Sequence, residues 1–115
     1  MEVNQIRKII EKTLNKNKAS NIVIIDLKKK SYIADYMIIA SGTSSRHIQS
    51  LSEIILSTLE ERGAGKFKIE GQTSDGWKLI DAADIIIHIF HPEKRKFYDL
   101  EKMWSEPILN EGINL

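Results

Sequence analysis

A continuous run of apolar residues, Tyr36–Ala40 (YMIIA), constrains the fold of this chain more than any other segment. A strand with one face in water alternates apolar and polar residues, and this run is too continuous to leave either face wet. The run therefore predicts a central strand of a sheet that is covered on both faces.

Asp84–Phe90 (DIIIHIF) predicts a second, strongly apolar strand. Successive side chains of a strand point to opposite faces, so three isoleucines share one face and His88 lies on the other with Phe90. GQTSDG, which precedes Trp77, has the residues of a turn. The remaining predicted strands are Ile22–Leu27, Phe67–Glu70 and Trp77–Asp81.

Two amphipathic helices are predicted from apolar residues at the helical period. The first spans Glu2–Lys16. The second is capped by Ser44 or Ser45 and ends near Gly63, because glycine readily adopts the left-handed conformation that ends many helices. A short third helix is predicted at Phe97–Trp104.

The order of these elements predicts the fold class. A helix, two strands, a helix, three strands and a short helix follow one another without an internal repeat or a linker. This order predicts a single α/β domain over residues 1–106, with one mixed five-stranded sheet flanked by helices, and a loose tail over residues 107–115. The two strands before the second long helix can pair as a hairpin, as can the three strands after it.

The composition bounds the class of protein. With 115 residues, 42% of them hydrophobic, the chain has the size and apolar content of one globular domain. No apolar run approaches the roughly 20 residues that cross a bilayer, and the charged N-terminal segment, which contains Glu2 and Glu11, is unlike a secretory or transit peptide. The absence of cysteine excludes disulfides and thiolate metal sites. We therefore expect a cytoplasmic protein without a membrane partner.

The net charge of +1 conceals an asymmetry along the chain. Residues 1–30 hold eight Lys and Arg against three acidic residues, whereas residues 31–115 hold nine basic and thirteen acidic residues. A protein that binds only nucleic acid is normally basic throughout. The acidic body therefore favours a basic partner, and the run Lys28–Lys30 is either a solvated turn or a contact with nucleic-acid phosphates.

The segment Ser41–Ser45 (SGTSS) joins a predicted strand to a predicted helix, and the backbone N–H groups of such a turn can bind a phosphate. Nucleotidyltransferases combine a comparable element with closely spaced carboxylates that hold Mg²⁺. Here the strand after the second helix carries the single acid Glu70, with Lys68 where a second acid would stand, and the pair Asp99-x-Glu101 lies near the C-terminal helix. A tight turn with a helix cap is therefore favoured over a catalytic site, and we expect no cofactor.

The histidines do not form a metal-binding pattern. His88 lies within a predicted strand and His91 beyond its end, and the sequence supplies no third ligand at a spacing such as H-E-x-x-H. We expect His88 to be a hydrogen-bonded, partly exposed residue of the sheet. His47, in the first turn of the second helix, is expected to be a surface or packing residue.

Trp77 is the most informative aromatic residue, because Glu70, Asp75, Asp81 and Asp84 are close to it in the sequence. If its ring faces solvent, it forms an aromatic anchor in an acidic rim, the kind of surface that recognises a basic protein. If its ring is buried, it is a core residue of a half-buried strand. The pattern alone does not separate these two interpretations.

Five segments, taken together, resemble the ribosomal silencing factor (Iojap) family from the first helix to Trp104. They are Asp35–His47, Glu70-Gly71, Gly76-Trp77-x-Leu79-Ile80-Asp81, Asp84–Phe90 and Tyr98-Asp99-Leu100-Glu101-x-x-Trp104. None of these segments is specific by itself, but their joint order and spacing are.

The resemblance implies a fold related to nucleotidyltransferases without their catalytic carboxylates, and a protein that is not an enzyme. It implies binding to the large ribosomal subunit through the fourteenth protein of that subunit, which sterically blocks joining of the small subunit and represses translation. A minor contact with ribosomal RNA, a homodimer away from the ribosome, and a role in large-subunit assembly all stay open.

The resemblance also favours the exposed interpretation of Trp77, because the family's partner surface is basic. The expected partner-binding residues are Glu70, Trp77, Asp81, His88, Tyr98 and Leu100.

Overall fold

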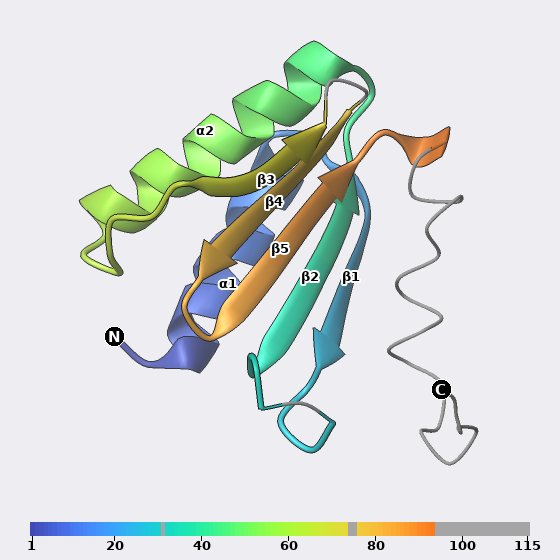
Figure 1. Cartoon of the computed structure of the whole chain (residues 1–115). Coiled ribbons are helices and arrows are strands. Elements are labelled where there is room, and N and C mark those ends of the chain that lie inside the picture. The colour runs from blue at the N-terminus through green and yellow to red at the C-terminus, as the bar shows by residue number, and fades with distance from the viewer. Residues whose placement is uncertain (31, 74–75, 94–115) are drawn as a thin grey trace, which may run out of the picture.

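The structure is a computed structural model that describes residues 1–30, 32–73 and 76–93. These residues form two long helices and a five-stranded sheet (Figure 1). The elements are α1 (Val3–Lys16), β1 (Ser20–Asp26), β2 (Tyr36–Ser41), α2 (Ser45–Glu61), β3 (Ile69–Thr73), β4 (Trp77–Ala82) and β5 (Ile85–Phe90).

The strands follow the order β1-β2-β5-β4-β3 across the sheet (Figure 1). β1 pairs with β2 and the last three strands pair with one another in antiparallel hairpins, whereas β2 and β5 are parallel. The mixed five-stranded α/β fold is therefore confirmed, as are both predicted hairpins. β2 has a neighbour on each side, as its continuous apolar run predicts.

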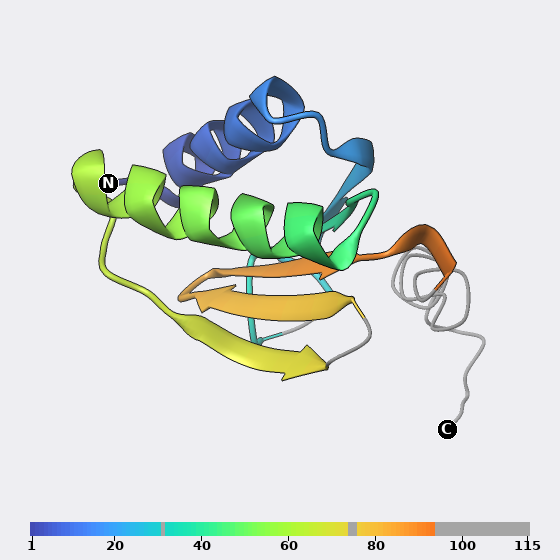
Figure 2. The same ribbon diagram turned by 90° about the horizontal axis from the view of Figure 1, so that it is seen from above.

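Both helices lie on one side of the sheet, as the view in Figure 2 shows. Their apolar stripes and the isoleucines of the strands form the main core, in which Ile10, Ile38 and Leu59 are completely buried. Burial of each such side chain contributes about 1.5–3 kcal/mol to folding. Neither described helix combines the length and the apolar character that a membrane crossing requires.

The opposite face of the sheet carries a second, smaller cluster of buried residues. It comprises Ile25, Leu27, Ala34, Met37, Ile39 and Phe90, with Val23, Trp77 and Ile86 partly buried beside it. Within the described part of the chain no helix covers this face, because α1 and α2 both pack on the other side. We call the side of the sheet that carries this cluster the open face, because neither α1 nor α2 packs on it, although the residues of the cluster are themselves buried.

The ends of α2 follow the local sequence. The hydroxyl oxygen of Ser44 accepts a hydrogen bond from the backbone N–H of His47 at 3.1 Å, so Ser44 is the N-cap. Gly63 lies just beyond the last turn with a φ of 79°, a conformation that glycine adopts without steric cost. Both features agree with the predicted bounds of this helix.

The predicted bounds of β3 are wrong. The sequence predicts a strand at Phe67–Glu70 and a turn from Gly71 onward, whereas the strand spans Ile69–Thr73. Pairing with β4 extends it, since Gly71 lies opposite Leu79 and Thr73 lies opposite Trp77. The predicted helix Phe97–Trp104 and the tail 107–115 lie outside the described residues.

Candidate partner-binding face of the sheet

Three rings from two neighbouring strands meet on the open face. The register of β4 and β5 places Trp77 opposite Phe90 and Leu79 opposite His88. The ring centroids of Trp77 and Phe90 lie 5.5 Å apart, and their planes differ by 5°. The ring centroids of Trp77 and His88 lie 5.8 Å apart, and their planes differ by 11°. His88 and Phe90 are likewise nearly parallel, with centroids 5.7 Å apart. These distances are typical of stabilising aromatic contacts, so the three rings form one stacked cluster.

The polar edge of the Trp77 ring is fixed by His88. The indole Nε1–H of Trp77 donates a hydrogen bond to Nδ1 of His88 at 3.1 Å. An indole N–H can only donate, so this Nδ1 carries no proton and the imidazole is the neutral tautomer with its proton on Nε2. His88 is 8% exposed, and this burial lowers its pKa to about 4. His88 is therefore uncharged near neutral pH, and it is hydrogen-bonded as predicted but more buried than predicted.

Trp77 itself is half-buried and lies beside the second cluster. The structure thus places it between the two interpretations that the sequence allows: one part of the ring packs in the molecule, and another part reaches the surface. Its neighbour Leu79 is half-buried on the same face, because side chains two positions apart on a strand share a face. These two side chains supply apolar surface beside the ring cluster.

The acidic residues are less tightly grouped around Trp77 than their sequence positions suggest. Asp81 is exposed and shares the open face with Trp77, but the two residues are four positions apart, or about 13 Å along the strand. Asp84, also exposed, follows in the turn before β5 and lies still farther from Trp77. Asp81 and Asp84 therefore do not lie against the ring, since an extended strand separates residues that are near in the sequence.

The other predicted contact residues are placed only in part. Glu70 is exposed on β3, where the pairing with β4 shifts between Ile69 and Gly71. Asp75, Tyr98 and Leu100 lie outside the described residues. Phe90 was not among the predicted contact residues, although the alternation of β5 places it on the same face as His88.

The turn Ser41–Ser45 donates hydrogen bonds to two neighbouring elements. The Gly42 N–H donates to the carbonyl oxygen of Phe90 at 2.9 Å, and the Thr43 N–H donates to Nδ1 of His47 at 3.0 Å. A Cβ on Gly42 would lie 2.7 Å from Cγ1 of Ile48, so the turn packs directly against α2. These contacts occupy N–H groups that a phosphate would need, which favours the capped turn over an anion site.

His47 connects this turn to the end of α1. Its Nδ1 accepts from the Thr43 N–H, and its Nε2 lies 2.9 Å from the carbonyl oxygen of Asn17. His47 is thus a packing residue that joins two loops. Across residues 1–30, 32–73 and 76–93, no group of three or more His, Asp and Glu side chains is arranged to hold a metal ion.

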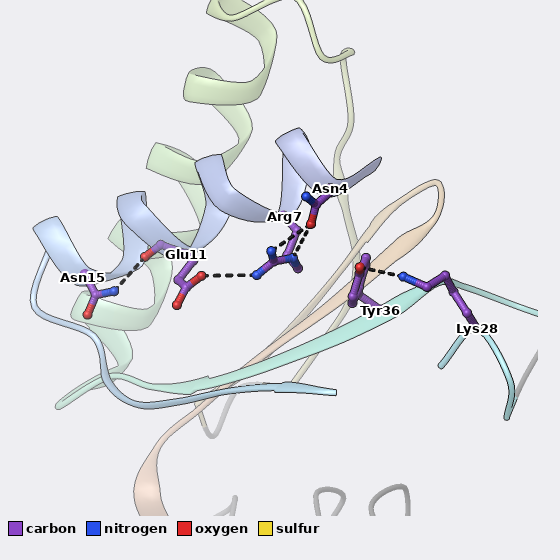
Figure 3. Close-up of polar contacts among 6 residues, drawn as sticks. All are labelled: Asn4, Arg7, Glu11, Asn15, Lys28 and Tyr36. Carbon is purple, nitrogen blue, oxygen red and sulfur yellow. Dashed lines mark hydrogen bonds and ion pairs between the residues drawn. The ribbon is translucent and has the colours of Figure 1, made fainter. Parts of the chain in front are cut away.

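Lys28, at the start of the predicted basic turn, folds back onto the sheet. Its Nζ donates to the hydroxyl of Tyr36 at 2.7 Å and lies 3.5 Å from Oδ2 of Asp26. The hydrogen bond to Tyr36 raises the pKa of Lys28. Figure 3 shows Lys28 beside Tyr36, together with the neighbouring Arg7, whose guanidinium carbon lies 5.4 Å from the centroid of the Tyr36 ring. Lys28 therefore already has protein partners.

Comparisons with known proteins agree with this fold. The family described as "Ribosomal silencing factor during starvation" matches residues 1–113. A ribosomal silencing factor from Zymomonas mobilis is 44% identical over 98 residues, which cover 85% of this chain and 74% of that protein. The mouse protein named mitochondrial assembly of ribosomal large subunit protein 1 is 34% identical over 80% of this chain and 42% of its own length.

A crystal structure of a protein from Chromobacterium violaceum superposes with a TM-score of 0.85 at 30% identity, over 99% of this chain and 95% of that chain. The family match extends over nearly the whole sequence, and the fold agrees with it from α1 to β5. This chain therefore belongs to the ribosomal silencing factor family.

Proposed function

We propose that this protein binds the large ribosomal subunit in the cytoplasm through the fourteenth protein of that subunit and blocks joining of the small subunit. Translation is repressed by steric exclusion, so no bond is made or broken. The observation that carries the proposal is the open face of the sheet, where the partly exposed Trp77 is held against the buried rings of His88 and Phe90 and neither helix packs on it.

The chemistry of this face suits a basic protein partner. Protein interfaces are anchored by a few aromatic residues in a packed centre, and charges around them set the rate and orientation of encounter. Trp77 and Leu79 offer half-buried apolar surface, and Asp81 and Glu70 are exposed acids. Because the hydrogen bond to His88 already fixes the Trp77 ring, less side-chain freedom is lost on binding.

A role in large-subunit assembly is the second candidate. The name of the mouse relative favours it, since that protein is named for assembly of the mitochondrial large subunit. Both functions use a contact with the large subunit, so the same face serves either one. A nucleotide-binding function has less support, because the Gly42 and Thr43 N–H groups of the Ser41–Ser45 turn already donate to Phe90 and His47.

Joining of purified subunits tests the proposed function. Small and large subunits are mixed at a Mg²⁺ concentration that lets them associate, with and without a molar excess of this protein. Light scattering follows the formation of whole ribosomes. We expect the protein to slow joining and to sediment with the free large subunit. Joining at an unchanged rate, with the protein bound to the large subunit, would favour the assembly function; the absence of binding would contradict both.

A further inference from the structure

A groove of about 680 Å³ lies between α1 and α2, in the helical layer on the other side of the molecule from the open face. Its floor includes Ile9 and Ile54, and its basic lining residues are Lys8, Lys12, Lys16 and Arg62. No acidic residue of the described chain lines it. We call these four cations and the floor between them the helical groove.

The three lysines form a single stripe. They recur at intervals of four along α1, so they share one side of the helix and are about 6 Å apart along its axis. Like charges at this spacing destabilise a helix by about 0.2–0.5 kcal/mol per pair. Stability of α1 therefore does not account for the stripe.

The groove cations are also free of acidic partners. All four side chains are exposed, and none forms an ion pair with an acid among residues 1–30, 32–73 and 76–93. Two cations on other parts of the N-terminal third do have partners: Arg7 bonds to Glu11 and Asn4, and Lys28 bonds to Tyr36 (Figure 3). The acids Glu60 and Glu61 of α2 do not line the groove. The groove thus gathers four cations without acidic partners in one concave place.

The lining favours a phosphate backbone over an acidic peptide. A peptide helix in a groove needs a row of apolar anchors, whereas this floor offers Ile9, which is 9% exposed, and the half-buried Ile54. A nucleic-acid strand presents one negative charge per about 3.4 Å. The stripe from Lys8 to Lys16 spans about 12 Å, so it can face several consecutive phosphates.

We propose that the helical groove binds the phosphate backbone of RNA. This site lies in the opposite layer from the open face, so the protein can contact a basic protein on one side and RNA on the other. The inference goes beyond the proposed function and does not depend on it, because RNA binding is measured without a ribosome.

The test uses the full-length protein and a short fluorescent single-stranded RNA, with anisotropy as the readout at 50–200 mM salt. The groove variant carries Lys8→Gln, Lys12→Gln and Lys16→Gln, which keep good helix formers in α1. The matched control carries Arg46→Gln, Lys66→Gln and Lys68→Gln, which remove the same charge from exposed positions that do not line the groove. Melting curves of all three proteins establish that each is folded.

If the four cations of the groove contact four phosphates, the RNA affinity of the wild-type protein should fall about 50-fold over this fourfold rise in salt. At low salt the groove variant should bind RNA at least about tenfold more weakly than wild type, whereas the control should bind about as tightly as wild type. In a plot of log affinity against log salt concentration, the slope of the groove variant should be smaller in magnitude by about two. Equal losses of RNA affinity in the groove variant and in the control would contradict the helical groove as the binding site. Undetectable RNA binding by the wild-type protein, or a groove that binds polyglutamate in preference to RNA, would overturn the choice of ligand. Neither result would alter the outcome of the subunit-joining experiment.

Discussion

The indole Nε1 of Trp77 lies 3.1 Å from Nδ1 of His88, so the aromatic residue at the centre of the open face is held by a buried, neutral histidine. This contact couples the stability of the sheet to the shape of its surface. A change at either residue alters both properties.

Replacing Trp77 with Phe keeps an aromatic ring but removes the donor to His88. The Nδ1 of His88 is then left buried without that hydrogen bond, which costs about 1–3 kcal/mol. We expect the free energy of unfolding, measured in urea, to fall by this amount. The double variant Trp77→Phe/His88→Phe is the control, because it removes both polar partners together and should recover part of the loss. A single variant as stable as wild type would contradict the importance of this hydrogen bond.

Stability should depend on pH through His88. Its pKa is about 4 in the folded protein and about 6.5 in an unfolded chain, so between these values the unfolded chain binds a proton that the folded protein does not. The stability that the neutral His88 contributes is complete above pH 6.5. As the pH falls toward 4, the free energy of unfolding decreases by about 3 kcal/mol in total.

The matched variant for this effect is His88→Asn, which retains an acceptor for Trp77 but does not titrate. Carboxylates are common to both proteins, so the difference between their unfolding free energies isolates the histidine. We expect that difference to change between pH 6.5 and pH 4 and to be constant above that range. Parallel pH profiles would show that His88 titrates normally in the folded protein.

The turn after β2 should tolerate no side chain at Gly42. An alanine Cβ would lie 2.7 Å from Cγ1 of Ile48 and 3.3 Å from the backbone nitrogen of Ile48, so either the helix or the strand must shift. Overpacking of this kind costs about 1–3 kcal/mol, which a thermal or urea melt detects. Ala at Gly63 is the comparison: no atom lies within 4 Å of its Cβ, and only the φ of 79° opposes it, at about 1 kcal/mol. A smaller loss at Gly42 than at Gly63 would contradict this packing.

The spacing of apolar residues predicted much of this fold, because it indicates which face of a helix or strand is buried. The alternation in Asp84–Phe90 placed His88 and Phe90 together, and Ser44 and Gly63 marked the ends of α2. The placement of β5 between β2 and β4 was not predictable, since it depends on pairing between segments that are distant in the chain.

The candidate site was predicted less completely for the same reason. Trp77 and His88 were identified separately, but their hydrogen bond depends on the register of two strands. Closeness in the sequence overstated how near Asp81 lies to Trp77, because a strand extends by about 3.3 Å per residue. β3 was misplaced because an edge strand can include polar residues such as Gln72 and Thr73 that resemble a turn.

The most direct test of the open face is a charge reversal at Asp81, measured by binding to isolated large subunits. Asp81 is exposed, so Asp81→Lys should leave the melting temperature unchanged while it places a positive charge against a basic partner. Glu61→Lys makes the same change in charge on α2, in the helical layer. Trp77→Ala completes the set, since loss of an aromatic anchor costs about 2–4 kcal/mol, or about 30- to 1,000-fold in affinity.

The account predicts that Asp81→Lys binds large subunits at least about tenfold more weakly than wild type, mainly through slower association, while Glu61→Lys binds normally. Trp77→Ala should lose more affinity than its melting curve explains. Normal binding by both open-face variants, each shown to be folded, would contradict the claim that this face of the sheet docks on the large ribosomal subunit.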